Sequence, residues 1–435
     1  MKTIYLSLII LISFSGISQK KLSLADAISI GLENNYQIKI SEKNIEIAQN
    51  NNNWGNAGLY PNLSLNLTQT NRYEERPNTM TNSIDKYYSN SLNPGLTLGW
   101  NLFNGFAVSI SKKNFEALQK MSEGNAALVV ENSIQAIVLA YYKILLEKEK
   151  LEVLNELMNL SADRFNYLQT KKDIGSAISY EVLQAKNAFL TDSATVLMQK
   201  MNIRSAETNL YLLLGISDDR EYSIEDELLI PLYDYPIDDL LKKMRSNNKT
   251  LQNQYVNLKI LNNSTKLSKS SIYPNLRLSA GTDKGYNRIK YVDEDAASAE
   301  SFDYYANFSL SFNLFNGGRT RRNIQNARIQ EEIAAIQTDE MVHKLENILL
   351  NLHELYQIRK QLIAIADENL KSSELNLSIS YDKFKAGTIN SFNYRDIQII
   401  YLNTALNRLT AVYNLIDTYT ELLRLTGGII NEYEK

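Results

Sequence analysis

Few side chains in this sequence could carry out covalent or metal chemistry. The 435 residues include no cysteine and only two histidines, His343 and His353. Without cysteine the chain has no disulfides and no thiolate metal sites, and two histidines in one glycine-free run do not predict a metal cluster. The sequence also lacks a Gly-x-Gly-x-x-Gly motif and a Walker-type phosphate loop. We therefore expect no enzyme activity, no metal site and no cofactor.

The charged side chains are numerous but balanced. There are 49 aspartates and glutamates against 46 lysines and arginines, so the formal net charge is −3. A chain this close to neutral does not favour a polyanion, and we expect no nucleic-acid partner. Some carboxylates will lie near one another, but on long helices such charges usually form a solvated face.

Proline and glycine, the residues that mark turns, are scarce and unevenly placed. The chain has six prolines and 17 glycines. No glycine occurs in residues 125–174 or 319–386, and no proline occurs in residues 95–230 or 275–435. An α/β enzyme with frequent turns is excluded by runs of this kind, which favour very long helices.

Residues 1–18 have the pattern of a secretory signal peptide. Lys2 precedes a short apolar run, and the small residues Gly16 and Ser18 follow it. The alternative, a transmembrane anchor, is disfavoured because the run is short. We predict an exported mature chain that begins near Gln19. If this chain spans a membrane, it must do so with strands, because no later segment is continuously apolar over a helical span.

A tandem duplication is indicated by landmarks that recur about 212 residues apart. It divides the mature chain into a first repeat, residues 19–216, a connector, residues 217–236, and a second repeat, residues 237–435. The paired landmarks are Asn34-Asn35 with Asn247-Asn248, Tyr60-Pro61-Asn62-Leu63 with Tyr273-Pro274-Asn275-Leu276, Asn101-Leu102-Phe103-Asn104-Gly105 with Asn313-Leu314-Phe315-Asn316-Gly317, Gly175 with Gly387, and Gly215 with Gly427.

Each repeat contains two stretches in which apolar and polar residues alternate, which predicts strands with one apolar face. A polar loop of twenty or more residues is expected between the two strands of a repeat. Proline at the strand starts and glycine at the strand-to-helix joints suit structural roles. The predicted strands are about 60–70, 95–104, 273–281 and 305–316, and the structural residues are Pro61, Gly105, Pro274 and Gly317.

Helical periodicity follows each strand pair. Apolar residues recur every seven positions from Ile137 to Phe165, and the equivalent positions from Leu349 to Leu377 are apolar or aromatic. A seven-residue repeat indicates coiled-coil packing. Short breaks at Gly175 and Gly387 then return the chain into a second helix, so each repeat should end in an antiparallel helical hairpin.

Four strands cannot close a barrel in a membrane, because open edges would leave backbone groups unpaired in lipid. The strands therefore form either a small soluble sheet or one part of a barrel that several chains share. Aromatic residues near the strand ends favour the second interpretation, since aromatic side chains suit the membrane–water boundary. These residues are Tyr60, Trp100, Phe103, Tyr273, Tyr304, Tyr305 and Phe315.

In combination, the repeated motifs resemble the TolC-type outer-membrane efflux proteins. They are the Tyr-Pro-Asn-Leu-x-Leu strand start, the Asn-Leu-Phe-Asn-Gly joint, and the turn Lys385-Ala386-Gly387-Thr388-Ile389-Asn390 followed by Tyr394-Arg395-Asp396-Ile397. The resemblance implies a mainly α fold with a small membrane β-barrel portion. Long antiparallel α-helical hairpins would form an α-barrel in the periplasm, and three chains would each give four strands to a twelve-stranded barrel in the outer membrane of a Gram-negative bacterium.

The same resemblance implies the function and the partners. The homotrimer would be a passive exit duct of a tripartite efflux or type I secretion system, surrounded by outer-membrane lipid. It would dock to a periplasmic membrane-fusion adaptor and an inner-membrane transporter of RND or ABC type. The cargo stays open between drugs, metal ions and proteins. The alternative is an exported, elongated coiled-coil scaffold or adhesin without a pore, which would be a soluble oligomer without conductance.

Carboxylates that follow the hairpin turns ring a pore constriction in the family that this chain resembles. Six positions after Gly175 stands Glu181, and six and nine positions after Gly387 stand Asn393 and Asp396. Asn393 departs from the acidic pattern, which puts strong cation-dependent blocking in doubt. Carboxylates gathered on a narrow axis repel one another and attract cations. The simpler interpretation of Glu181 and Asp396 is a pair of solvated charges near helix N-termini.

The hairpin turns themselves are the expected adaptor-docking surfaces by the same resemblance. Glycine allows a sharp turn and a close approach of a partner, although plain helix termination explains it equally well. The docking residues so assigned are Asp173, Ile174, Gly175, Ser176, Lys385, Ala386, Gly387 and Thr388.

Overall fold

The computed structural model describes residues 20–80, 83–217, 222–224, 226, 228, 236–292 and 295–433. The predicted signal peptide, residues 1–18, and much of the predicted connector lie outside this part of the chain. The chain divides into two compact units. The hairpin unit comprises the residues up to Ser41, Ala127–Lys249 and His343–Lys435, and the sheet unit comprises Glu42–Ala126 and Thr250–Val342.

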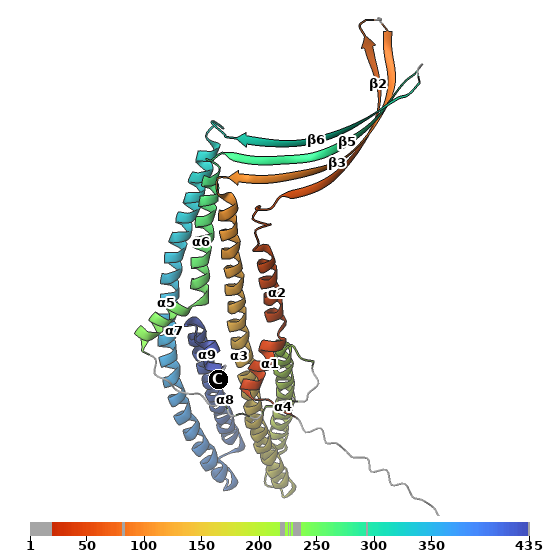
Figure 1. Ribbon diagram of the computed structural model, residues 1–435. Coiled ribbons are helices and arrows are strands. Elements are labelled where there is room, and N and C mark those ends of the chain that lie inside the picture. The colour runs from red at the N-terminus through yellow and green to blue at the C-terminus, as the bar shows by residue number, and fades with distance from the viewer. Residues whose placement is uncertain are drawn as a thin grey trace, which may run out of the picture. The chain divides into compact units, whose positions relative to one another are not determined.

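The sheet unit is built on one antiparallel sheet of four strands in the order β2-β3-β5-β6 (Figure 1). The strands are β2 (Asn62–Asn78), β3 (Ser83–Asn104), β5 (Asn275–Tyr291) and β6 (Ala297–Ser311). The two hairpins of the sheet therefore come from different repeats, and β3 joins them by pairing with β5. One register irregularity lies between Asn101 and Phe103.

The strands differ from their predicted extents. The prediction of a polar loop of twenty or more residues in each repeat was wrong: β2 continues to Asn78 and β3 begins at Ser83, while β5 continues to Tyr291. At the other end β6 stops at Ser311, short of the predicted residue 316. Apolar alternation is lost where the strands become polar, but backbone pairing and cross-strand contacts such as the Tyr73 and Tyr88 rings, 4.9 Å apart, stabilise the pairing.

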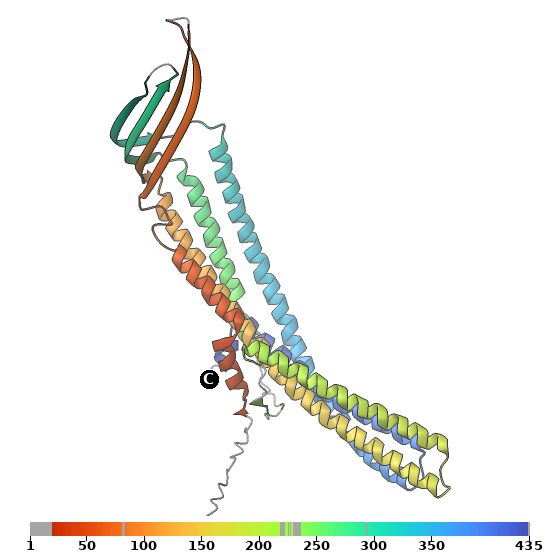
Figure 2. The same ribbon diagram turned by 90° about the vertical axis from the view of Figure 1, so that its right-hand side faces the viewer.

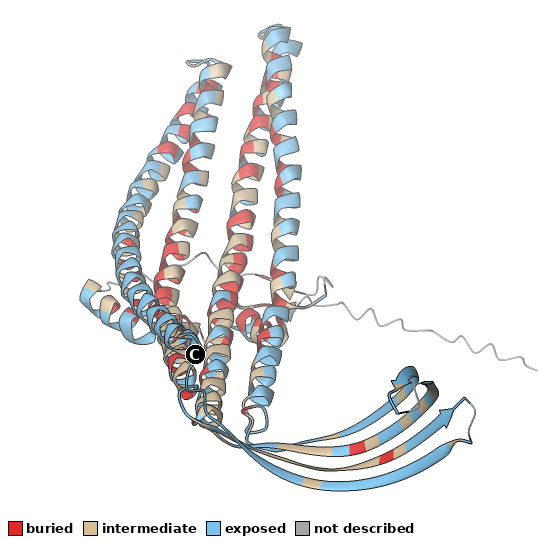
Figure 3. Ribbon diagram, turned by 90° about the horizontal axis from the view of Figure 1, so that it is seen from above, coloured by how far each residue is buried: buried red, intermediate tan, exposed pale blue. Residues whose placement is uncertain are grey.

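One face of the sheet is apolar over the part that lies nearer the helices of the sheet unit. Leu65 pairs with Leu96, Leu96 with Thr282, and Thr282 with Tyr304, so these four side chains share a face. This face is uncovered within one chain, since Leu65 is 74% exposed and Leu310 is 70% exposed. Figure 3 shows the strands mainly as exposed and intermediate residues, with few buried ones. The opposite face carries polar residues such as Ser64 and Thr97.

Both edges of the sheet lack a partner strand among the described residues. β2 pairs only with β3, and β6 pairs only with β5. A free edge exposes a row of unpaired backbone groups, which a strand of another chain can complete. The sheet of one chain is therefore an incomplete structure.

Four helical segments complete the sheet unit. They are held by polar contacts, among them the Lys112 Nζ to Asn52 Oδ1 bond of 2.7 Å and the Thr265 Oγ1 to Ala327 carbonyl bond of 3.1 Å. The helices involved are most of α2 (Tyr36–Asn51), most of α6 (Lys249–Ser270), and the first parts of α3 (Ala107–Asp173) and α7 (Arg319–Lys385).

The hairpin unit contains two antiparallel helix pairs that lie side by side (Figure 2). The later part of α3 pairs with α4 (Ser179–Leu214), and the later part of α7 pairs with α8 (Ser391–Leu425). Shorter elements pack near their other end: α1 (Leu24–Asn34), α5 (Ile237–Asn247), α9 (Ile429–Tyr433), and the parallel pair β1 (Lys20–Lys21) and β4 (Tyr222–Ser223), the latter within the predicted connector.

The predicted seven-residue seam lies on the packed side of the hairpins. Ile137, Ile144, Leu349 and Tyr356 are fully buried, and Leu377 is 8% exposed. The remaining seam positions, Leu151, Met158, Phe165, Ile363 and Leu370, are half-buried. A described stretch of α3 is also apolar and long enough to cross a membrane by composition alone, but half of it is buried within the fold, as in the core helix of a soluble protein.

Candidate pore site at the hairpin turns

The two hairpin turns have the same backbone structure. After α3, Gly175 takes φ 75° and the amide of Ser176 donates to the Lys171 carbonyl at 2.7 Å. After α7, Gly387 takes φ 76° and the amide of Thr388 donates to the Lys383 carbonyl at 2.9 Å. The left-handed φ favours glycine, and these bonds satisfy carbonyls that the helix end leaves free.

Both turns are open on their outer side. A Cβ atom added to Gly175 or Gly387 would meet nothing within 4 Å among the described residues. Steric contact therefore does not require glycine there, whereas backbone conformation does. Apolar side chains near the first turn are also exposed, with Ile174 at 72% and Tyr180 at 64%.

The predicted constriction residues occupy matching positions after the two turns. Glu181 is the third residue of α4 and Asn393 the third residue of α8, and Asp396 follows one helical turn later. Both turns lie at the same end of the hairpin unit (Figure 2). Asn393 and Asp396 are exposed and Glu181 is half-buried.

The local hydrogen bonds leave these three side chains available. The Asn390 side chain caps α8 by accepting the Asn393 backbone amide at 2.8 Å. Within the described residues the side chains of Glu181, Asn393 and Asp396 make no hydrogen bond or ion pair. Acidic groups in a first helical turn are favourable because they face unpaired amide groups.

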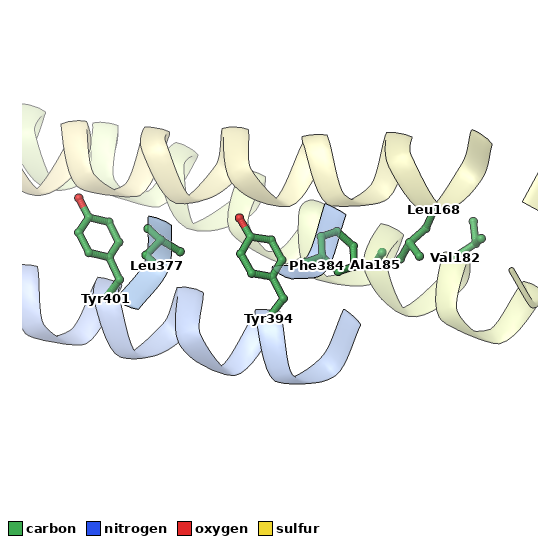
Figure 4. Packing of buried hydrophobic residues seen from close by; sticks show 7 residues of the cluster. All are labelled: Leu168, Val182, Ala185, Leu377, Phe384, Tyr394 and Tyr401. Atoms are coloured by element: carbon green, nitrogen blue, oxygen red, sulfur yellow. The ribbon is translucent and has the colours of Figure 1, made fainter. Parts of the chain in front are cut away.

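A buried cluster joins the two hairpins next to the turns (Figure 4). The rings of Phe384 and Tyr394 stack with centroids 4.9 Å apart, and Tyr167 meets Phe384 edge-on at 5.1 Å. Tyr167 also donates a hydrogen bond of 3.0 Å to the Lys385 carbonyl, which ties the first hairpin to the second turn. The buried members are Leu168, Val182, Ala185, Leu377, Phe384, Tyr394 and Tyr401.

A buried ion pair crosses between the hairpins in the same region. Arg395 of α8 donates two hydrogen bonds to the Asp192 carboxylate of α4, at 2.7 and 2.8 Å. Its Nη1 also donates to Ser161 Oγ of α3 at 2.8 Å, and Ser161 in turn bonds Asp192. The side chain of Asp192 is 7% exposed and that of Arg395 is 17% exposed. Three helices therefore converge on one carboxylate.

A second arginine lies beside this ion pair. Arg164 is 4% exposed and donates from Nη1 to the Ser391 carbonyl at 3.0 Å, at the start of α8. Burial, together with the positive charge of Arg395, lowers the pKa of Arg164 to about 10. We name Ser161, Arg164, Asp192 and Arg395 the interhairpin network. Sequence analysis missed this network, because Arg395 looks like one more charge between Asn393 and Asp396, and Asp192 lies far from it along the chain.

The family model described as outer membrane efflux protein matches residues 27–216 and 240–428. No curated protein sequence matches the chain.

Similar solved structures share the fold at low sequence identity. The outer membrane channel CmeC of Campylobacter jejuni is 16% identical, with a TM-score of 0.74 over 95% of this chain and 89% of that chain. The outer membrane protein VceC of Vibrio cholerae is 16% identical, with a TM-score of 0.71 over 93% and 96%. The outer membrane channel MtrE of Neisseria gonorrhoeae, solved in an open state, is 15% identical, with a TM-score of 0.67 over 96% and 94%.

The family assignment explains how the open edges of the sheet find partner strands. Proteins of this family assemble as trimers and dock with other components of pumps. Three chains close a twelve-stranded barrel in which every strand edge has a partner, as lipid requires. The scaffold or adhesin alternative is not favoured. Because the family match covers both repeats, this chain belongs to the outer membrane efflux protein family, and it is a non-enzymatic efflux exit duct of a Gram-negative outer membrane with a helical tunnel in the periplasm.

Proposed function

We propose that the hairpin turns form the periplasmic constriction of the duct and that Glu181, Asn393 and Asp396 line it. The observation that carries the proposal is the matching position of Glu181 and Asn393 in the first turns of α4 and α8, at one end of the unit. In a trimer, Glu181 and Asp396 would together place six carboxylates near the axis. Gathered carboxylates attract cations and raise one another's pKa values.

The interhairpin network supports the same assignment. Arg395 is the basic residue between Asn393 and Asp396, and its guanidinium bonds Asp192 and Ser161 instead of these neighbours. The side chains of Glu181 and Asp396 therefore have no ion-pair partner among the described residues. Asn393 contributes no charge, so cation binding would be weaker than in a ring with an acid at this position.

The turns are the proposed docking surface for a periplasmic membrane-fusion adaptor, which would connect the duct to an inner-membrane transporter of RND or ABC type. The open space around Gly175 and Gly387 and the exposed Ile174 support a protein contact there. The residues proposed for docking are Asp173, Ile174, Gly175, Ser176, Lys385, Ala386, Gly387 and Thr388. The transporter would supply the energy and select the cargo, for either efflux or type I secretion.

Single-channel conductance tests the constriction. We expect Asp396→Arg to change both the conductance of the trimer in planar bilayers and its block by divalent cations, because three positive charges would replace three negative ones. Glu374→Arg is the matched control: it reverses an exposed charge on α7, away from the turn. If both variants behave like the wild type, Asp396 does not line the constriction.

Adaptor docking is tested at the second turn. Gly387 is a poor position for substitution because its φ of 76° strains any side chain, so Ala386, which is exposed, is the better choice. We expect Ala386→Trp to abolish retention of the purified adaptor on the immobilised trimer, while Asn56→Trp, in an exposed turn of the sheet unit, retains it. Equal adaptor retention by both variants would contradict docking at this turn.

A further inference from the structure

The apolar face of the sheet has a polar upper margin that the duct function does not explain. The register places Leu92, Asn90 and Tyr88 of β3 on the same face as Leu96, and it pairs them with Tyr286, Arg288 and Lys290 of β5. This end of the sheet carries the connections between paired strands and lies away from the helices of the sheet unit (Figure 1). It is therefore the outer end of the barrel.

The height of these residues follows from strand geometry. Ten residues separate Leu276, near the helices, from Tyr286, which at about 3.3 Å rise and about 40° of tilt amounts to roughly 25 Å along the barrel axis. That distance matches the apolar band of an outer-membrane barrel. Tyr286 and Tyr88 thus lie at the outer membrane–water boundary, and Arg288 and Lys290 lie level with the lipid headgroups.

Only some of the charges at this level are paired within the described residues. Lys86 pairs with Glu75 at 3.2 Å, and Lys284 pairs with Glu300 at 3.6 Å. Arg288 and Lys290 are exposed, and neither forms an ion pair in the described part of the chain. Arg288 and Lys290 therefore face outward at headgroup height without an ion-pair partner among the described residues, which do not include the next acidic residues, Asp293 and Glu294.

A shallow depression of about 330 Å³ adjoins Arg288. Its outward-facing lining combines polar groups with an apolar floor, namely Gln69, Asn90, Leu92, Tyr286, Arg288 and Glu300. Toward the membrane the same face carries Lys284, the partner of Glu300, and then becomes apolar at Leu96 and Thr282 and at Leu98 and Ala280. A hydrogen-bonding hollow with the Arg288 guanidinium in its lining, and with its Glu300 carboxylate paired to Lys284, thus stands above an apolar surface that begins at Leu96.

We propose that this hollow is a binding site for a phosphate-bearing glycolipid of the outer leaflet. Arg288 and Lys290 bind the phosphate, because a guanidinium forms strong charge-assisted hydrogen bonds with phosphate oxygens. Asn90 and Gln69 face the sugar hydroxyls, and the acyl chains descend along Leu92 and Leu96. A neutral headgroup would leave both cations unpaired, and a free phosphate would leave the apolar surface uncovered.

The probe is lipid A, a glucosamine lipid with two phosphates, titrated onto the detergent-solubilised trimer and followed by native mass spectrometry. A basic residue near a lipid surface contributes about fivefold to binding, so we expect Arg288→Gln to weaken lipid A binding about fivefold and Arg288→Gln with Lys290→Gln about 25-fold. Dephosphorylated lipid A should bind the wild type and the double variant equally weakly.

Arg76→Gln is the matched control. Arg76 lies on β2 near the same end of the sheet and is exposed, but the register places it on the polar face. Equal lipid A binding by the double variant and the wild type, or equal weakening by Arg76→Gln, would overturn the proposal. Displacement of lipid A by equimolar inorganic phosphate would also overturn it, in favour of a simple anion site. If the double variant does not assemble, the comparison of the two lipids on the wild type still decides the role of the phosphate.

Discussion

Removal of Arg395 should loosen the end of the hairpin unit. Arg395→Met keeps the length of the side chain but leaves the Asp192 carboxylate, 7% exposed, with one hydrogen bond, from Ser161, and with the more distant charge of Arg164. Breaking one partner of a buried ion pair costs about 3 to 5 kcal/mol. The pKa of Arg164 is lowered partly by the charge of Arg395, so its loss relieves a repulsion and offsets part of that cost. We expect a net loss of about 3 kcal/mol.

Hydrogen exchange measures this loss where it occurs, because local opening has its own free energy. A loss of about 3 kcal/mol corresponds to roughly 100-fold faster exchange of amides near Ser161 and Asn393 in the detergent-solubilised trimer. Arg408→Met is the control, since the 2.7 Å pair of Arg408 with Asp367 is 40% and 49% exposed and should contribute less than about 1 kcal/mol.

A double variant separates the ion pair from general packing. Arg395→Met with Asp192→Leu replaces both charges by apolar groups, which removes the uncompensated carboxylate and should restore most of the protection. Unchanged exchange in Arg395→Met would refute the structural importance of the pair. If the free-energy losses of the two single variants, calculated from hydrogen exchange, add up in the double variant, the two residues act independently.

Two further predictions concern a buried acid and the strand-to-helix joints. Burial raises the pKa of Glu131 to about 7, so the folded state favours the protonated form. The contribution of Glu131 to the free energy of unfolding is fully present below its ordinary pKa near 4.5. This contribution, about 3 kcal/mol, is lost as the pH rises through 7. Glu131→Gln should therefore stabilise the trimer at pH 8 and not at pH 4, and thermal unfolding that shows equal gains at both would contradict this. Gly105→Ala should destabilise the protein more than Gly317→Ala, because both glycines have positive φ but only at Gly105 would a Cβ meet Ser270 and Tyr273. Unfolding temperatures that fall equally would count against this steric difference.

Prediction from sequence succeeded where one segment carries its own periodicity. The seven-residue pattern identified the packed side of α3 and α7, and the left-handed glycines at 175 and 387 ended those helices as expected. It failed for the outer parts of the strands. Residues 71–78 carry no apolar alternation, and they form a strand because β3 pairs with them along their whole length.

The interhairpin network was beyond sequence analysis for a related reason. Asp192 and Arg395 belong to different repeats, and no local pattern marks either as buried. Their pairing depends on how the two hairpins pack around the cluster that includes Phe384 and Tyr394. A charge on a long helix has the same sequence signature whether it faces water or a partner helix.

The duplicated plan of strands and helical hairpins can be derived from the amino-acid sequence, because proline, glycine and apolar spacing act through backbone conformation and local burial. Three further features arise only in the folded chain: the lengths of the strands, the burial of Arg395 against Asp192, and the register that places Arg288 and Lys290 opposite Asn90 and Tyr88 on one face of the sheet. Each of these depends on register or packing between segments far apart in the chain. Such contacts are settled by the summed burial and hydrogen bonding of the whole fold, which no single segment encodes.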